Sequence, residues 1–304
     1  MLGANNPYRQ QVAWLLEVLP LVGREDCFAL KGGTAINLFV RNMPRLSVDI
    51  DLAYLPVGDR DVSLPDIAAA LERIASALEL RLRGSKVQRT IAGGQIIKLV
   101  AWRNGVRVKI EVSPVMRGCV REPSVQGVSA AVEDLFGYVE VPVVHADDLY
   151  AGKLCAALDR QHSRDLFDVR LLLENEGIEA GLLDVFVVYL LSSDRPLAEL
   201  LSPNRKPLAA TFEAEFTGMT LIPVTLAELE QTRETMINLI RERLTDPQRQ
   251  FLLGFKQGEP DWGLLNPPGI ENLPAVQWKL LNIRRMTPAR REQALENLRQ
   301  VLWG

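Results

Sequence analysis

Helical spacing of apolar residues appears twice in the first third of the chain. In residues 10–21 the side chains of Trp14, Leu15 and Val18 fall on one side of a helix, and residues 65–80 carry a similar apolar stripe. A shorter apolar stretch over residues 35–40 predicts a short helix between them.

Strand-like patterns follow in the same half of the chain. Residues 48–54 are apolar apart from Asp49 and Asp51, and this stretch predicts a strand. The pairs Gly93-Gly94 and Asn104-Gly105 separate three β-rich runs, and both pairs tolerate the positive φ of tight hairpin turns. The predicted β-rich runs are residues 86–92, 95–102 and 106–112, with a further extended segment over 137–144.

The second half of the chain has mostly helical periodicity. The predicted helices span residues 147–159, 164–174, 182–191, 226–244, 247–255, 274–282 and 288–302. Near residue 145 the pattern changes from mixed helix and strand to mostly helical. This change predicts a core domain over residues 1–145 and a helical domain over 146–304. We therefore expect an α+β fold, a mixed sheet with flanking helices followed by a mostly helical half.

Three carboxylates lie on the predicted strands. Asp49 and Asp51 are two residues apart, so a strand places them on the same face, where like charges repel unless a cation lies between them. Glu111 lies on the polar side of the alternating strand V-R-V-K-I-E-V and would join them if the two strands are neighbours. Carboxylates in such a group suit divalent metal ions that also bind phosphates. An ordinary solvent-facing position is the alternative for Glu111.

A glycine-rich turn precedes the predicted helix at residues 35–40. Gly32, Gly33 and Thr34 follow an apolar pair, and glycines before a helix let backbone N–H groups approach a phosphate. Thr34 is a candidate for capping this helix or for donating its hydroxyl to a triphosphate. A Gly-Gly-Thr motif alone is more often a turn, but here the Asp-x-Asp strand follows it within one unit.

The combination resembles the nucleotidyltransferase superfamily of the DNA polymerase β type, and within it the AbiEii/AbiGii and MenT group of bacterial toxins. The stretch L-Y-A-G-K-L-C-A-A-L-D-R-Q-H-S-R-D-L-F-D-V and the C-terminal G-E-P-D-W-G-L-L and L-P-A-V-Q-W-K-L-L-N-I also resemble this group. The resemblance covers most of the chain and is weakest between residues 175 and 245. In this sequence the gap between Thr34 and Asp49 is longer than in many members of the superfamily.

This resemblance implies a set of site residues. Asp49, Asp51 and Glu111 would hold Mg²⁺, or Mn²⁺ in its place, and would be catalytic together with Lys153 and Asp168. The implied nucleotide-binding residues are Lys31, Gly32, Gly33, Thr34 and Lys153, with Lys153 acting as a point charge on the triphosphate. Asp168 would orient Lys153 or accept a proton. The alternative is that Lys153, Arg160, Arg164, Asp165 and Asp168 are charges that only stabilise two helices.

Charge and composition argue against several classes of protein, among them membrane proteins and proteins with a cysteine metal site. The formal net charge is −3, so the whole molecule does not attract nucleic acid, although arginines cluster locally. Arg41, Arg45, Arg160 and Arg164 are the candidate RNA contacts, and solvated helix surface is the alternative. The three cysteines have no metal-like spacing and are expected to be reduced thiols. No stretch suits a membrane span or a signal peptide, so we expect a cytoplasmic protein without membrane partners.

The leading hypothesis is a Mg²⁺-dependent transferase that moves NMP from an NTP to an acceptor hydroxyl and releases pyrophosphate. The resemblance implies a toxin of an AbiE-like, type IV toxin–antitoxin or phage-defence system, with a tRNA 3′ end as acceptor and a separately encoded antitoxin. One alternative is a toxin that binds GTP or another nucleotide without transfer. Another is a transferase that modifies a small molecule, which would need an acidic pocket for a cationic acceptor.

Overall fold

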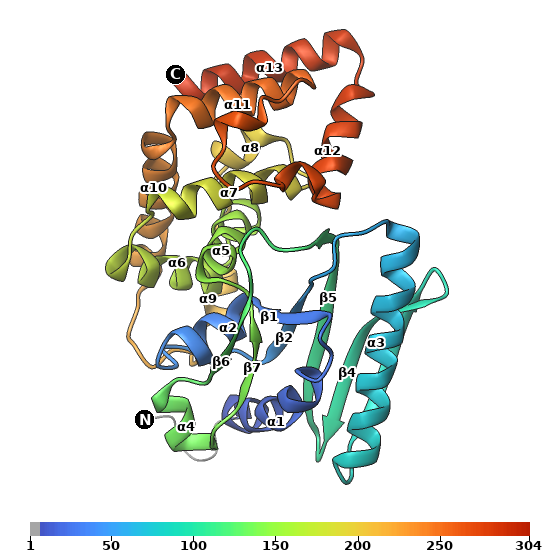
Figure 1. Ribbon diagram of the computed structural model, residues 1–304. Coiled ribbons are helices and arrows are strands. Elements are labelled where there is room, and N and C mark those ends of the chain that lie inside the picture. Colours follow the sequence, from blue (N-terminus) through green and yellow to red (C-terminus); the bar gives the residue numbers. More distant parts are fainter. Residues whose placement is uncertain (1–6) are drawn as a thin grey trace. The chain divides into compact units, whose positions relative to one another are not determined.

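The computed structural model describes residues 7–304 and divides them into two compact units (Figure 1). The first unit runs to His145 and also contains the returning segment Gly218–Pro223. The second unit comprises Ala146–Thr217 and Val224–Gly304. The sequence-based division at residue 145 did not include this returning segment.

The first unit is built on one mixed sheet with the strand order β3-β4-β5-β2-β1-β7-β6. Its central pairs β2–β5 and β1–β7 are parallel, and the other neighbours are antiparallel. The strands are β1 (Phe28–Lys31), β2 (Asp49–Tyr54), β3 (Lys86–Ala92), β4 (Gln95–Arg103), β5 (Val106–Arg117), β6 (Ser124–Gly127) and β7 (Glu140–Val143). This sheet with its helices confirms the predicted α+β class.

Helices α1 (Pro7–Val22) and α3 (Arg60–Arg81) cover one face of the β3–β4–β5 part of the sheet (Figure 1). The alternation predicted for β5 is the reason: Val108 and Ile110 are fully buried, while their neighbours Arg107 and Lys109 point to the other face. The indole of Trp14 on α1 donates a hydrogen bond to the Ala101 carbonyl of β4 at 3.2 Å. The opposite face of these strands carries polar side chains.

The predicted hairpin turns are confirmed by the backbone. Gly93 and Gly94 have φ of 57° and 79°, and Asn104 and Gly105 have φ of 52° and 81°. Two successive positive φ values are those of a type I′ turn, whose twist matches the flanking strands. Strands β3, β4 and β5 therefore form a continuous antiparallel meander.

The segment between α2 (Gly32–Ala35) and β2 is held by the returning segment. The helix continues through a π-helical turn, Ile36–Val40, before the chain bends back toward β2. Leu46 N–H then donates to the Met219 carbonyl, and Leu221 N–H donates to the Pro44 carbonyl, both at 2.8 Å. The returning segment, which belongs to the first unit, thus fixes the loop that precedes β2.

The second unit is helical, as the periodicity predicts. Its α-helices are α5 (Ala146–Arg160), α6 (Ser163–Asn175), α7 (Ala180–Ser192), α8 (Leu197–Leu201), α9 (Ala209–Glu215), α10 (Leu226–Arg243), α11 (Asp246–Gln257), α12 (Pro274–Arg284) and α13 (Pro288–Trp303). Helices α5, α6 and α7 pack together, and α10 packs on α6. Capping boxes begin α10 at Thr225 and α11 at Thr245, where each threonine hydroxyl accepts the third helical N–H. Among the described residues, no helix combines the length and apolar character that crossing a membrane requires.

Several short elements were not predicted from the pattern. These are β1, β6, α4 (Ala130–Phe136), α8 and α9, each of at most seven residues. In addition, α3 begins at Arg60, five residues before the predicted start, so that Pro65 lies inside the helix and not at its first position. Short elements carry too few residues for a period to be recognised.

All three cysteines are free thiols. Burial, followed by the nearby carboxylates of Asp66 and Glu25, raises the pKa of Cys27 to about 11. Burial and then Asp159 raise the pKa of Cys155 above its usual range. These environments favour the neutral thiol, in agreement with the predicted reduced state.

We expect Cys27 to resist alkylation in the native protein. At about pH 8 its thiolate fraction is ~0.001, roughly two orders of magnitude below that of an ordinary cysteine, because only the thiolate reacts. Iodoacetamide labelling followed by peptide mass spectrometry measures this rate, with urea-unfolded protein as the control. Equal labelling of Cys27 in native and unfolded protein at this pH would contradict the burial argument.

Candidate active site

The pairing of β2 with β5 brings three carboxylates to one face of the sheet. In the parallel register Asp51 lies directly opposite Glu111, and Asp49 lies opposite Lys109. Asp49 and Asp51 share a face because they are two residues apart on one strand. The strands that carry Asp51 and Glu111 are therefore neighbours in the sheet of the first unit, as the grouping of the three carboxylates requires.

Lysines compensate this negative charge. The ammonium of Lys109 lies 3.1 Å from a Glu111 carboxylate oxygen and 3.8 Å from an Asp49 oxygen, and Lys98 lies 3.6 Å from Glu111. Burial works to lower the pKa of Lys109, but Asp49 and then Glu111 outweigh it, so the pKa is raised. These carboxylates favour a positive charge beside them.

The donor set fits a divalent cation, although it is not convergent as it stands. Asp49, Asp51 and Glu111 offer the hard oxygen ligands that Mg²⁺ prefers. Over residues 7–304, however, no three Asp, Glu, His or Cys side chains already form a group that could hold a metal ion. The lysine ammonium between Asp49 and Glu111 has the sign of charge that a cation would supply there. Binding a metal at this face requires Lys109 to turn away.

The turn between β1 and α2 approaches the Asp51 carboxylate closely. Gly32 has a φ of +73°, and a Cβ added there would lie 2.5 Å from Asp51 Oδ2. A Cβ at Gly33 would lie 2.6 Å from a guanidinium nitrogen of Arg45 and 3.0 Å from the Ser47 hydroxyl. Only glycine leaves room for backbone and carboxylate to come so close.

Thr34 and Lys31 lie differently from the sequence-based expectation. Thr34 is inside α2 rather than at its N-cap, which is Lys31, and its buried hydroxyl donates to the Asp49 carbonyl at 2.5 Å. This bond ties the start of β2 to α2, so the side chain is used internally. Lys31 lies opposite Asp51 in the β1–β2 register; burial lowers its pKa, and Asp51 opposes that shift.

The two arginines expected to contact RNA beside this loop have different environments. Arg45 is only 3% exposed, and its guanidinium donates to the Leu46 carbonyl at 2.9 Å. In this structure the side chain therefore supports the loop from inside, and the RNA contact expected of Arg45 stays a prediction. Arg41 follows the π-helical turn and is half-buried.

In the second unit Lys153 and Asp168 are brought together. The Lys153 ammonium lies 2.9 Å from Asp168 Oδ2 and 2.8 Å from Asp165 Oδ1, and all three side chains are almost fully buried. Arg160 also binds Asp165, with Nε 2.5 Å from its Oδ2. Burial alone would raise the pKa of Asp165, but Lys153 and Arg160 hold it well below its usual range. The buried group thus balances two carboxylates with two cations.

The turn between α5 and α6 fixes this group. His162 caps α6 by accepting the Arg164 N–H at its Nδ1, and its Nε2 lies 3.0 Å from Glu215 Oε2. Gln161, buried and with a φ of 51°, donates to the Asn204 carbonyl at 2.7 Å and accepts the Lys206 N–H at 3.0 Å.

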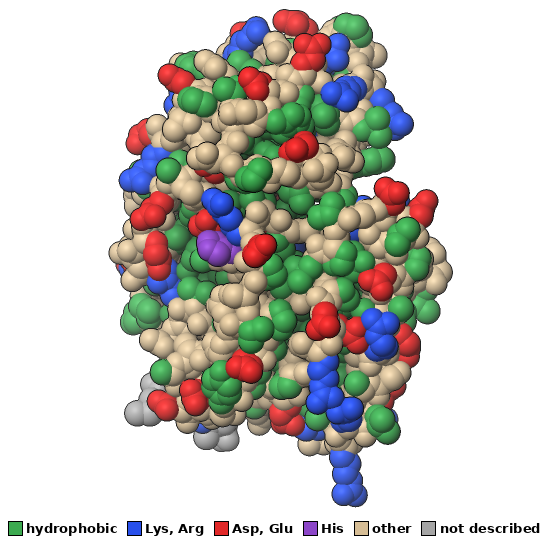
Figure 2. Space-filling model, viewed as in Figure 1, with side chains coloured by type: hydrophobic (Ala, Val, Ile, Leu, Met, Phe, Trp, Pro, Cys, Tyr) green, Lys and Arg blue, Asp and Glu red, His purple; other side chains and the backbone are tan. Residues whose placement is uncertain are grey.

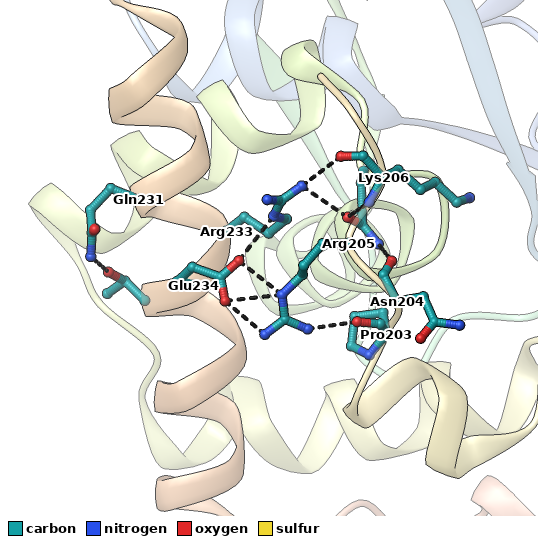
Figure 3. Close-up of polar contacts among 9 residues, drawn as sticks. Pro203, Asn204, Arg205, Lys206, Gln231, Arg233 and Glu234 are labelled. Carbon is teal, nitrogen blue, oxygen red and sulfur yellow. Dashed lines mark hydrogen bonds and ion pairs between the residues drawn. The ribbon is translucent and has the colours of Figure 1, made fainter. Parts of the chain in front are cut away.

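Residues 203–206, which Gln161 binds, are in turn held by α10. Figure 3 shows Arg233 and Glu234 on α10 facing Arg205 and Lys206; Arg233 donates to the Lys206 carbonyl at 2.8 Å, and the Arg205 guanidinium binds Glu234 at 2.7 Å. The α5–α6 turn and residues 203–206 therefore form one hydrogen-bonded corner.

Arg160 and Arg164, the remaining RNA candidates, are both paired with carboxylates. The Arg160 side chain is largely exposed, although its guanidinium binds the buried Asp165, and the Arg164 guanidinium lies 3.6 Å from Glu215. On the side of the molecule seen in Figure 2, acidic and basic side chains interleave without a continuous basic area. The arginine-rich helices therefore do not make a uniformly basic face in this view.

Two charged residues of these groups, Lys109 and Asp165, were not identified from the sequence. The pattern of the strand does not single out Lys109, although its spacing of two from Glu111 places it on the acidic face. Asp165 was treated with the surface charges, yet it is the carboxylate that joins Lys153 to Arg160. The spacing of three between Asp165 and Asp168, on one helix face, was the available signal.

A family model described as "Nucleotidyl transferase AbiEii toxin, Type IV TA system" matches residues 14–282. The chain is similar in structure to MenT4, a nucleotidyltransferase toxin from Mycobacterium tuberculosis, with a TM-score of 0.62 and 16% identity over 96% of this chain and 93% of that one. It also matches terminal uridylyl transferase 4 from Trypanosoma brucei with bound dUTP, at a TM-score of 0.31 and 13% identity over 97% and 92% of the two chains. A comparison with curated protein sequences gives no match.

Replacing Gly32 by alanine should destabilise the first unit more than the same change at Gly84. Both glycines have a positive φ, +73° and +80°, but only at Gly32 would the new Cβ meet another atom, the Asp51 carboxylate. We expect Gly84→Ala to cost about 1 kcal/mol and Gly32→Ala roughly 1–3 kcal/mol more. Urea unfolding measures both, and equal losses would show that the close approach to Asp51 has no energetic weight.

Asp165→Asn should lower the free energy of unfolding by about 3 kcal/mol near neutral pH, because it leaves a buried lysine with one carboxylate fewer. The folded-state pKa of Asp165 is depressed, so its stabilising effect is present above the unfolded-state pKa of ~4 and disappears as pH falls toward the folded-state value. The difference between wild type and variant should shrink below about pH 4.

The matched control is Glu174→Gln, which removes an exposed carboxylate paired with Arg170 four residues earlier and should cost at most ~0.5 kcal/mol. Urea midpoints measured across the pH range compare the two variants. A loss at Asp165 as small as that at Glu174 would contradict a stabilising role for the buried group.

Proposed function

Since the chain belongs to the AbiEii nucleotidyltransferase toxin family of type IV toxin–antitoxin systems, we propose that it transfers NMP from an NTP to the 3′ hydroxyl of an RNA, with tRNA as the acceptor. The observation that carries this proposal is the β2–β5 register, which sets Glu111 opposite Asp51 and leaves Asp49 on the same face. The family membership supports nucleotidyl transfer in general, and the MenT4 likeness supports the fold.

The reaction needs charge neutralisation and positioning more than covalent chemistry. The acceptor oxygen forms a bond to the α-phosphorus while the bond to the β-phosphate oxygen breaks, and pyrophosphate leaves with that electron pair. The hydroxyl proton passes to solvent. In the proposed arrangement Asp49, Asp51 and Glu111 hold Mg²⁺, which when bound supplies positive charge to the reacting phosphate.

The β1–α2 turn is the proposed phosphate site. Its backbone N–H groups at Gly32 and Gly33 can approach a phosphate because neither residue has a side chain. Thr34 takes part through its backbone, since its hydroxyl is engaged with Asp49. Lys31, beside Asp51, adds a cation to the same turn.

Lys153 and Asp168 are proposed to act from the helical unit. Lys153 provides a buried positive charge that serves the nucleotide, and its ammonium is held by Asp165 and Asp168. Because the Asp168 carboxylate is buried against Lys153, we assign it to positioning rather than to proton transfer. Arg41, Arg160 and Arg164 remain candidate contacts for the acceptor backbone.

The toxin would act in the cytoplasm, where transfer to tRNA would block translation and growth until a separately encoded antitoxin intervenes. A nucleotide-binding toxin that does not transfer is the second candidate. One observation favours it. The ammonium of Lys109 lies beside Asp49 and Glu111, and a site that works without a metal ion needs such a cation to compensate its carboxylates. Three acids on one face, however, have no use in a site that only binds.

The deciding experiment incubates the full chain with Mg²⁺, total bacterial tRNA and each NTP in turn, radiolabelled at the α-phosphate. We expect label on tRNA with one or more NTPs, and a loss of at least ~100-fold in the Asp49→Asn/Asp51→Asn double variant, because that pair holds the metal. Omitting Mg²⁺ should abolish labelling.

The matched control is Asp59→Asn/Asp61→Asn, which removes two exposed aspartates at the same spacing at the start of α3, its N-cap and a residue of its first turn, and should leave labelling unchanged. Absence of label with every NTP, together with tight NTP binding, would instead support the toxin that binds without transfer. Label on a small-molecule acceptor but not on RNA would support the third class.

A further inference from the structure

The polar face of β3, β4 and β5 extends away from the three carboxylates as a continuous surface. Along each strand, exposed or half-buried side chains alternate with buried ones that face α1 and α3. In β4, for example, Trp102 is 45% exposed while the preceding Ala101 is fully buried. The helices of the first unit with the main contacts to these strands, α1 and α3, pack on the buried side chains of the opposite face.

The strand registers align these side chains in rows. One row runs from Thr90 through Lys98 and Glu111 to Asp51. The next comprises Gln88, Val100, Lys109 and Asp49. The third places Trp102 between Lys86 and Arg107.

The third row lies a short distance from the carboxylates. Residues on one face repeat every ~7 Å along a strand and neighbouring strands are ~4.8 Å apart, so Trp102 lies roughly 14 Å from Glu111. That distance is covered by a few nucleotides of unpaired strand. The row is therefore within reach of a polynucleotide whose end lies at Glu111.

The geometry of the transfer reaction gives this surface a direction. The attacking hydroxyl enters opposite the leaving pyrophosphate. The proposed phosphate turn is at Gly32, at the end of β1, and β1 and β5 flank β2 on opposite sides. A leaving group over β1 requires the acceptor to approach over β5. The rest of the acceptor then extends over β4 and β3.

The side chains of the third row suit an unpaired nucleic acid strand. An exposed indole flanked by cations provides a stacking surface for a base and charges for the adjoining phosphates. Both Lys86 and Arg107 are exposed, and within residues 7–304 neither forms an ion pair. A row made of one aromatic ring and two cations without acidic partners complements a polyanion.

From these observations we infer that the open face of β3, β4 and β5 is the track of the RNA acceptor, on which Trp102 stacks an unpaired base and Lys86 and Arg107 contact phosphates. The inference rests on the proposed transfer function, because that function sets the direction of approach. It assigns RNA contacts that differ from the arginines expected from the sequence.

The test compares full-length variants for binding to a short fluorescein-labelled single-stranded RNA. Trp102→Ala should raise Kd about 10-fold, and Trp102→Phe should bind nearly as wild type because it keeps a stacking ring. Lys86→Gln/Arg107→Gln should reduce the slope of log K against log salt by about 1.4, the value for two phosphate contacts on a single strand. Trp278→Ala is the matched control, since it removes a tryptophan of the helical unit that is 58% exposed.

Two outcomes would overturn the track. One is wild-type RNA affinity in both the Trp102→Ala and the Lys86→Gln/Arg107→Gln variants. The other is unchanged RNA binding accompanied by lost binding of the co-expressed antitoxin, which would make this face a protein-docking surface. Thermal melting checks that each variant is folded, and NTP binding should stay at the wild-type level.

The same variants separate this inference from the proposed function. If the wild type labels tRNA and the variants label it with an unchanged KM, the transfer function stands and the track is wrong. If the wild type binds RNA through this face but labels it with no NTP, the transfer function fails while the surface remains an RNA-binding surface. The expected result is an increase of ~10-fold in KM for tRNA in Trp102→Ala, with kcat less affected.

Discussion

The parallel pairing of β2 with β5 is the constraint on which the candidate site depends. Parallel neighbours need a long connection, and the chain supplies it with α3 and the β3–β4 hairpin. The register is fixed from the buried side, where Ile50 lies opposite Ile110 and both are fully buried. A slip of one residue would turn Glu111 into the core and a hydrophobic side chain outward. The packing that stabilises the sheet therefore also sets the spacing of the acids.

This register places three negative charges close together, and they must be compensated. Three carboxylates on adjacent positions repel one another, and the fold answers with lysines on the same rows: Lys109 beside Asp49, Lys98 beside Glu111 and Lys31 opposite Asp51. All these groups are partly exposed, so water and mobile ions weaken their attraction. In the proposed function a divalent ion would take the place of an ammonium beside Asp49 and Glu111, because it concentrates more positive charge at one point. In this structure, lysines on the sheet face therefore compensate part of the negative charge of the three carboxylates.

The sequence was sufficient for the features that have a period or a spacing. It predicted the α+β class, the three-strand meander with its two turns, most long helices and the shared face of Asp49 and Asp51. It did not predict the internal use of Thr34 and Arg45, because their hydrogen bonds to Asp49 and Leu46 depend on how the loop folds back. The returning segment Gly218–Pro223 was also missed, since nothing local in it marks a contact with residues more than 170 positions earlier.

The two charged groups differ in a way that separates their roles. The carboxylates of the sheet are about one-third exposed, whereas the ionised groups of Lys153, Asp165 and Asp168 are nearly excluded from water. An exposed carboxylate can exchange a lysine for another cation at lower cost than a buried one, because solvent already surrounds it. A buried ion pair cannot lose one member without leaving an uncompensated charge, a change that costs several kcal/mol. The carboxylates of the sheet are therefore open to ligand exchange in the proposed function, whereas the charges of Lys153, Asp165 and Asp168 are fixed in place by folding.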